Sequence, residues 1–255
     1  MASTKKFYDG LTPLYHLIYP DWEKSIKRQG EMLDSVIREM WGSVSDILDV
    51  SCGIGTQTLG LSSIGYNMTA SDLSQEQVDR AKKEAAKRNL SVSFSVADMR
   101  CCFEHHQRQF DVVISCDNSI PHLLSDEDIL RTFRELFNCT RTGGGCIISV
   151  RDYEKEDLSQ QQIKQYGIRE ENDIRWLIWQ VWDPSPPIYD VTMYFVEDRG
   201  NPTCITYAFQ SKYYAISISS LISLMQLAGF EDVRRLDGRL FQPMIIGTRK
   251  TQQIT

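Results

Sequence analysis

A glycine-rich turn follows the first predicted strand, at the edge of the sheet where a ligand would bind. The strand is the buried run ILDVS at 47–51, and it leads directly into the segment CGIGT at 52–56. Glycines in such a turn let a ligand approach the backbone closely, and doubly wound sheets bind ligands beyond the carboxyl ends of their strands. We therefore expect Ser51, Gly53 and Gly55 to border a cofactor, with an ordinary strand-to-helix turn as the alternative.

Polar residues also stand at the ends of the next three predicted strands. Asp72 ends the second strand, where a carboxylate can accept hydrogen bonds from both hydroxyls of a ribose. Asp98 and Met99 follow the third strand, where they could contact an adenine, and Cys116 lies at the end of the fourth. Each acid alone could be a turn residue, but polar strand ends in this order favour a nucleotide-containing cofactor.

The elements that must position these residues alternate between short β-branched runs and longer amphipathic stretches. This alternation is typical of βαβ units and implies a parallel sheet with right-handed crossovers. Ser74, with Gln77 three residues later, predicts the start of a surface helix. We expect strands at 47–51, 67–72, 91–98, 110–117 and 143–152, and helices at 55–64, 74–89 and 127–140.

After residue 172 the pattern changes to aromatic, alternating runs that favour a small antiparallel sheet. A helical pattern then returns at 217–230, and two last runs could form a terminal hairpin that joins the main sheet. The antiparallel piece is therefore predicted to be an insertion. Its runs lie at 173–183, 189–198 and 204–214, and those of the hairpin at 231–238 and 240–250.

Charge and cysteine content exclude several classes of partner. The formal net charge is -6 and the pI is near 5.3, which offers no general electrostatic basis for binding nucleic acid. No apolar stretch could cross a bilayer and the first residues have no signal-peptide pattern, so we expect a cytoplasmic protein without a membrane partner. Seven cysteines, with Cys101 and Cys102 adjacent, favour reduced thiols over a disulfide framework.

Two further cofactor types are disfavoured. The segment CCFEHH at 101–106 contains metal-ligating residue types, but adjacent residues cannot all face one tetrahedral ion, so no metal is expected. Thr58 stands where a dinucleotide fingerprint would have its third glycine. No Tyr-x-x-x-Lys pair follows the fourth strand either, so an NAD-dependent oxidoreductase is the weaker interpretation.

Between about residues 45 and 150 the chain resembles the class I S-adenosylmethionine (SAM)-dependent methyltransferases. The segment ILDVSCGIGT resembles their first motif, Asp72 their second, and FDVVISCDNSIPHL and TGGGCIISV their later motifs. The strand-four segment most resembles that of the glycine and glycine/sarcosine N-methyltransferases. The resemblance implies an α/β, Rossmann-like fold: a mostly parallel seven-stranded sheet, helices on both faces, and a small antiparallel β insertion that acts as a lid.

The resemblance also divides the chain and suggests substrate residues. It implies a helical cap segment at 1–44, a SAM-binding core at 45–155, an antiparallel lid at 156–214, and a C-terminal helix and hairpin at 215–255. Arg151 matches the family arginine that holds the substrate carboxylate, Asn118 the asparagine that contacts substrate, and Tyr194 the tyrosine on the lid. A guanidinium suits a carboxylate, although a structural ion pair of Arg151 is the alternative.

In the family the N-terminal segment closes over SAM with aromatic residues and an arginine. Tyr19, Trp22 and Arg28 are the matching candidates here. A helix that packs its aromatic stripe onto the sheet is the alternative for Tyr15 and its neighbours. His122 is a possible general base near strand four, although a core or helix-capping histidine is the commoner explanation.

The sequence therefore predicts a SAM-dependent N-methyltransferase that acts on glycine, sarcosine or both, as in betaine synthesis, by direct in-line transfer without a covalent intermediate. Its partner would be a small amino acid substrate, and the sequence does not decide between a monomer and a homo-oligomer. Two alternatives stay open. One is a SAM-dependent methyltransferase of another small molecule, such as dimethylglycine, a carboxylate or a natural product, and the other is a SAM-binding regulatory protein without turnover.

Overall fold

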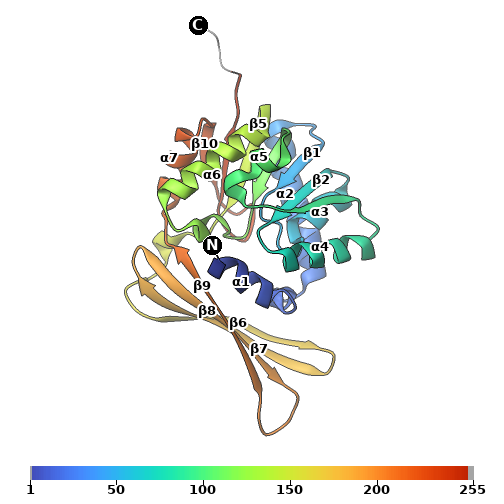
Figure 1. Cartoon of the computed structure of the whole chain (residues 1–255), viewed down its shortest axis with the longest axis vertical. Helices are drawn as coiled ribbons and strands as arrows, with labels where there is room; N and C mark the ends of the chain where they lie inside the picture. Colours follow the sequence, from blue (N-terminus) through green and yellow to red (C-terminus); the bar gives the residue numbers. More distant parts are fainter. Residues whose placement is uncertain (1, 252–255) are drawn as a thin grey trace.

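The computed structural model describes residues 2–251 and contains two β-sheets (Figure 1). The larger sheet has seven strands in the order β10-β11-β5-β4-β1-β2-β3, and the smaller has four in the order β6-β7-β8-β9. The helices are α1 (Ala2–Leu11), α2 (Trp22–Trp41), α3 (Thr56–Ile64), α4 (Gln75–Lys87), α5 (Cys102–His106), α6 (Asp126–Cys139) and α7 (Ile218–Leu227). Short 3-10 helices are η1 (Tyr15–Ile18), η2 (Met99–Cys101), η3 (Ile120–Leu123) and η4 (Tyr153–Lys155).

The five predicted βαβ strands are confirmed as a parallel sheet. They are β1 (Asp46–Asp49), β2 (Asn67–Asp72), β3 (Val92–Val96), β4 (Phe110–Ser115) and β5 (Thr140–Ser149). The predicted hairpin also joins this sheet: β11 (Met244–Thr248) pairs antiparallel with β5 and with β10 (Glu231–Leu236). Because parallel strands end at one edge, the segments after β1, β2, β3 and β4 come together there.

Helices cover both faces of the seven-stranded sheet. On one face α2 packs Leu33 and Ile37 against apolar side chains of the central strands. On the other face α6 and α7 contribute Phe133 and Leu221 to a second cluster. Ser74 is the predicted N-cap of α4, since its hydroxyl accepts a hydrogen bond from the backbone N–H of Gln77. The helices thus cover the two faces of the sheet and leave its carboxyl edge to be covered by other segments.

The smaller sheet is antiparallel throughout, as the alternating runs predicted. Its strands are β6 (Gln162–Glu171), β7 (Ile174–Ser185), β8 (Ile188–Asp198) and β9 (Ile205–Tyr214). The sequence did not reveal β6, because its charged residues and a register shift between Gln165 and Gly167 interrupt the apolar alternation. Helix α1 lies between this sheet and the seven-stranded core (Figure 1).

The N-terminal segment belongs to the packing between the two sheets. Phe7, Leu11 and Leu17 form one apolar cluster with Met193 and Phe195 of β8. On the side of the core, the Ser74 hydroxyl donates to Asp9, and Gln77 donates to the backbone oxygen of Tyr8. These contacts place α1 and η1 over the carboxyl edge of the sheet. The division of the chain at residues 44, 155 and 214 stays a prediction.

Candidate functional site

One cavity lies at the carboxyl edge of β1, β2 and β4, and it collects most of the residues predicted to bind a cofactor. The N-terminal segment covers it with Tyr8, Tyr15 and Tyr19. Residues on its wall include polar groups from the strand ends and the side chain of Met99. The predicted residues that line it are Tyr19, Ser51, Gly53, Asp72, Asp98, Met99 and Cys116.

Asp72 is fixed at this wall by backbone donors. Its Oδ2 accepts a hydrogen bond from the N–H of Gly53 at 2.9 Å, and its Oδ1 accepts one from the N–H of Ser74 at 2.9 Å. Burial raises the pKa of Asp72, while these two N–H groups act in the opposite direction. Gly53 has φ +54°, a left-handed conformation that glycine adopts without strain. The carboxyl group is therefore held in one orientation beside the glycine turn.

Asp98 differs from Asp72 because its carboxylate is already paired with a cationic side chain. Its carboxylate forms an ion pair with Arg100, Oδ2 to Nη2, at 2.8 Å, and this pairing with Arg100 helps keep the pKa of Asp98 low despite partial burial. Arg100 also pairs with Asp128 of α6 at 2.8 Å. Asp98 can still accept a further hydrogen bond, since a carboxylate has several lone pairs.

A second cavity shares a wall with the first. Tyr8, Tyr15, Tyr19 and Asp117 line both cavities. The Tyr19 hydroxyl donates to Oδ2 of Asp117 at 3.0 Å, and Asp117 takes up a left-handed conformation with φ +59° at the end of β4. Such a conformation is unfavourable for a non-glycine residue and often occurs at functional sites. The shared wall means that ligands in the two cavities would meet near these residues.

Arg151 and Asn118, which the resemblance matched to substrate residues, both line the second cavity. The Asn118 side chain accepts from the backbone N–H of Arg151 at 3.0 Å and donates to the hydroxyl of Tyr153 at 2.8 Å. The Arg151 guanidinium lies 4.4 Å from the ring centroid of Trp182 and donates to the hydroxyl of Tyr189 at 3.2 Å. Asn118 thus fixes the backbone from which Arg151 projects.

Within residues 2–251, no carboxylate forms an ion pair with Arg151. The neighbouring acid Asp152 pairs instead with Arg235 at 2.7 Å and with Lys155 at 3.4 Å. The described part of the chain therefore contains no structural ion pair of Arg151, which was the alternative explanation for this residue. A partly buried guanidinium that lies beside aromatic rings and hydroxyls has donors to spare for an anionic group.

Tyr194 lines neither of the two cavities, so its predicted place at the substrate site has no support from this geometry. Side chains alternate between the two faces of a strand, and in β8 it is Met193 that lines the second cavity. Tyr194 faces the other way and stacks on Trp179 of β7, with 5.4 Å between the ring centroids. The tyrosines of this sheet that do line the cavity are Tyr166 of β6 and Tyr213 of β9.

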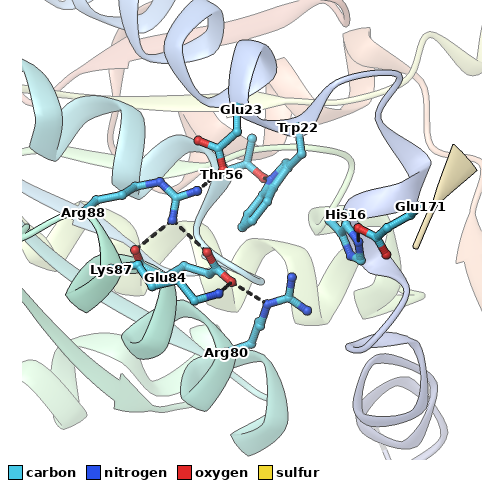
Figure 2. Close-up of polar contacts among 9 residues, drawn as sticks. All are labelled: His16, Trp22, Glu23, Thr56, Arg80, Glu84, Lys87, Arg88 and Glu171. Atoms are coloured by element: carbon cyan, nitrogen blue, oxygen red, sulfur yellow. Dashed lines mark hydrogen bonds and ion pairs between the residues drawn. The ribbon is translucent and has the colours of Figure 1, made fainter. Parts of the chain in front are cut away.

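Trp22, predicted to lie near a cofactor, does not line the first cavity. Its indole Nε1 donates to the Thr56 hydroxyl at 2.8 Å, and Thr56 in turn lines the cavity (Figure 2). The guanidinium carbons of Arg80 and Arg88 lie 5.7 Å and 5.4 Å from its ring centroid. Trp22 therefore contacts the first residue of α3 and supports the cavity wall through Thr56.

Arg28 and Gly55 do not line the first cavity. Arg28 is exposed and lines the second cavity instead of the first. Gly55 is the N-cap of α3 with φ +99°, and a Cβ there would meet the Leu59 side chain at 3.1 Å. Gly55 is thus needed for the turn and for packing, and it is not part of the cavity wall.

The sequence missed the partnership of Tyr8 with His122. The Tyr8 hydroxyl lies 2.8 Å from Nε2 of His122, and Nδ1 lies 3.1 Å from the backbone oxygen of Lys212. Because that oxygen can only accept, Nδ1 carries the proton and Nε2 accepts from Tyr8. Burial lowers the pKa of His122 to about 3. His122 is therefore neutral and a weak base, and no local pattern around Tyr8 indicates this contact.

Among the described residues no group of three or more histidine, cysteine or acidic side chains could hold a metal ion. The same part of the chain has no helix that is long and apolar enough to span a membrane.

Comparison with known proteins identifies methyltransferases among the similar sequences and structures. Residues 47–144 match the family model described as a methyltransferase domain. A glycine/sarcosine N-methyltransferase of Aphanothece halophytica is 27% identical over 134 residues, which are 52% of this chain and 50% of that protein. The chain spans about half the length of the curated relatives of this kind that it matches.

Solved structures resemble the chain over almost its whole length. DesVI of Streptomyces venezuelae superimposes with a TM-score of 0.81 at 16% identity, covering 92% of this chain and 97% of DesVI. A SAM-bound amino pentose methyltransferase of Micromonospora echinaspora gives a TM-score of 0.77 at 13% identity, covering 89% and 92%. The chain therefore contains a methyltransferase domain and has the Rossmann-like fold of the class I SAM-dependent methyltransferases.

Proposed function

We propose that this chain is a SAM-dependent N-methyltransferase whose acceptor is a small amine that also carries a carboxylate. More specifically, we propose glycine or sarcosine as the acceptor. The observation that carries the proposal is Arg151: it lies in a cavity that shares the Tyr8, Tyr19 and Asp117 wall with the cofactor cavity. The similarity to glycine/sarcosine N-methyltransferases supports the same acceptor.

The residues of the first cavity fit SAM by their chemistry. Asp72 would accept hydrogen bonds from the ribose hydroxyls, and the apolar side chains of Leu73 and Met99 would border the adenine. Ser51 and Gly53 would allow close approach of the methionine part. When bound, SAM supplies a methyl group on a positively charged sulfur, which makes its carbon an electrophile.

The second cavity would hold and orient the acceptor. Arg151 would bind the carboxylate with two parallel hydrogen bonds, which a planar guanidinium favours. Tyr166 and Tyr213 would border the acceptor, and Tyr8 would offer its oxygen lone pairs at the junction of the cavities, because its proton is directed at His122. Most of the rate enhancement would come from this alignment, since fixed geometry removes much of the entropic barrier.

The transfer itself would be a direct displacement. The lone pair of a neutral amine attacks the methyl carbon, and the carbon–sulfur bond breaks with its electron pair going to sulfur. The products are the N-methylated ammonium and S-adenosylhomocysteine. The neutral His122 cannot take a proton from an ammonium effectively. The acceptor would therefore bind deprotonated, after losing its proton to solvent.

A larger amine is the second candidate acceptor. The second cavity extends from Arg151 to the exposed side chains of Arg28 and Phe241, further than glycine would require. The solved neighbour from Micromonospora echinaspora is an amino pentose methyltransferase, and an amino pentose is larger than glycine. An amino sugar or another natural-product amine is therefore the alternative, and a SAM-binding protein without turnover is a third possibility to be tested.

The deciding experiment is calorimetric titration of SAM, followed by methyl-transfer assays with glycine, sarcosine, dimethylglycine and a panel of amino sugars. Binding of SAM together with turnover of glycine or sarcosine supports the full proposal. Turnover of amino sugars alone supports the second candidate. Binding without any turnover favours the regulatory alternative, and a lack of SAM binding overturns all of these proposals.

A further inference from the structure

One guanidinium joins the lid sheet to the N-terminal segment through backbone oxygens. Arg169 of β6 donates from Nε to the backbone oxygen of Tyr19 at 2.9 Å, and from Nη2 to that of Ile18 at 3.3 Å. The same Nη2 donates to the backbone oxygen of Tyr166 at 2.9 Å. One side chain thus connects the backbones of Tyr19 and Tyr166, which both line the acceptor cavity.

The local backbone of β6 makes this arrangement possible. The strand has a register shift between Gln165 and Gly167, and Gly167 has φ +98°. A bulge of this kind leaves backbone groups unpaired in the ladder and bends the strand. The guanidinium of Arg169 also donates to the backbone oxygen of Ile168 at 2.8 Å. Its planar set of five donors therefore contacts four backbone oxygens on the two segments at once, more than the three donors of a lysine ammonium could serve.

A second contact joins the same two segments. Nε2 of His16 in η1 lies 2.9 Å from Oε1 of Glu171 at the end of β6 (Figure 2). Arg169 and Glu171 thus contact residues 16 to 19 from one strand end. The two contacts fix where η1 lies relative to the lid.

The position of Tyr19 matters for both cavities. Its ring lines the cofactor cavity and the acceptor cavity, and its hydroxyl donates to Asp117 on their shared wall. Any shift of the Tyr19 backbone would change both binding sites together. Tyr166, on the other side of Arg169, would move with the lid.

We propose that Arg169 is a positioning residue that holds Tyr19 and Tyr166 at a fixed separation, and thereby couples the lid to cofactor binding. Arg169 itself lines neither cavity, so it acts through the two tyrosines. The identity of the ligand used to test this rests on the proposed function. The position of η1 is a property of the protein without ligand and can be tested separately.

The first test is calorimetric titration of S-adenosylhomocysteine into the wild type, Arg169→Ala and Arg169→Lys. We expect the Kd to rise about tenfold in both variants, within the usual range of coupling between sites. Arg175→Ala is the matched control, because Arg175 is an arginine of the neighbouring strand that pairs with Asp198 away from both cavities. It should bind as the wild type does. Wild-type affinity, within twofold, in both Arg169 variants would overturn the proposal.

The second test is hydrogen exchange of the ligand-free proteins. Amides of residues 15–21 should exchange faster in Arg169→Ala than in the wild type and in Arg175→Ala, while α2 and the core strands keep their protection. If exchange at 15–21 is unchanged, Arg169 does not hold this segment and the proposal fails. If Arg169→Ala does not unfold cooperatively, Arg169→Lys serves for both measurements.

The two tests separate this proposal from the proposed function. A wild type that does not bind S-adenosylhomocysteine counts against the proposed function, and the exchange of residues 15–21 then decides alone about Arg169. Wild-type binding together with unchanged affinity in the variants counts against the role of Arg169 and leaves the proposed function intact.

Discussion

The Thr58 hydroxyl donates a 2.7 Å hydrogen bond to Oδ2 of Asp49 beneath the glycine turn. Thr58 stands where a dinucleotide fingerprint would place its third glycine. Thr58 supplies a hydroxyl at this position in place of a glycine. The Asp49 side chain is buried and therefore needs a hydrogen-bond donor. A second donor is the backbone N–H of Ser51, 3.2 Å from Oδ1 of the same carboxyl group.

This burial raises the pKa of Asp49 to about 7, despite the opposing hydrogen bonds. Between about pH 4 and 7 the unfolded chain loses this proton and the folded chain keeps it, so stability falls as pH rises. Asp49→Asn has no such titration. From pH 5 to pH 8 its free energy of unfolding should fall less than that of the wild type, by a difference of about 2 to 4 kcal/mol.

Urea unfolding of both proteins at the two pH values measures the difference. Asp190→Asn, which removes an exposed carboxylate of the lid, is the control and should follow the wild type. Parallel pH dependences of the wild type and Asp49→Asn would show that Asp49 is ionised in the folded state.

Glu84 of α4 is buried, and its carboxylate forms ion pairs with three cationic side chains (Figure 2). Arg80 and Lys87 each lie 2.9 Å from its Oε1, and Arg88 lies 2.7 Å from its Oε2. Despite burial, these hydrogen bonds lower the pKa of Glu84 to about 2. The stabilisation is present above about pH 4.5 and is lost as the pH falls towards 2.

Glu84→Gln should therefore reduce the free energy of unfolding at pH 7 by about 2 kcal/mol, and the difference from the wild type should shrink near pH 3. Chemical denaturation at the two pH values, with Glu104→Gln of an exposed residue as the control, checks this. An equal difference at both pH values would contradict the ionic origin.

Replacement of Arg151 tests the acceptor site. Arg151→Lys should raise the KM of the acceptor about 100-fold and leave the Kd of SAM within twofold, because an ammonium cannot form the two parallel hydrogen bonds of a guanidinium. Arg151→Ala should be at least as severe. Steady-state kinetics with calorimetry of SAM distinguishes the two sites. A loss of SAM affinity equal to the rise in KM would place Arg151 at the cofactor.

The two tyrosines of the lid provide a matched pair. Tyr166→Phe should raise the KM of the acceptor by about fivefold to tenfold, about the effect of one lost hydrogen bond, since Tyr166 lines the acceptor cavity. Tyr194→Phe should leave the kinetics unchanged, because Tyr194 faces away and stacks on Trp179. The reverse result would place Tyr194, and not Tyr166, at the substrate site.

The pH dependence of the reaction tests the neutral state of His122. Its pKa is lowered to about 3 by burial, so kcat/KM should show no inflection near pH 6.5 and should rise with deprotonation of the acceptor amine. Rate profiles of the wild type and His122→Asn between pH 5 and 9 measure this. An inflection near pH 6.5 that disappears in the variant would assign the base role to His122.

The sequence by itself determined the core of the fold and the order of the strand ends. Hydrophobic periodicity predicted the strands of the main sheet, and the constraint that parallel strands end at one edge brought Gly53, Asp72 and Asp98 to one cavity. These predictions depend on short-range patterns and on a topology with few alternatives. Arg151 after β5 was singled out by the family resemblance, and it lines the second cavity.

Only the tertiary structure decided which aromatic residues of the lid and the N-terminal segment face the cavities. A strand exposes alternate residues to opposite faces, so a shift of one residue exchanges Met193 for Tyr194. The bulge that positions Arg169, and the contact of Tyr8 with His122 across 114 residues, depend on how two sheets and α1 pack together. Such long-range contacts leave no local period in the sequence, because they are set by the relative placement of elements and not by the elements themselves.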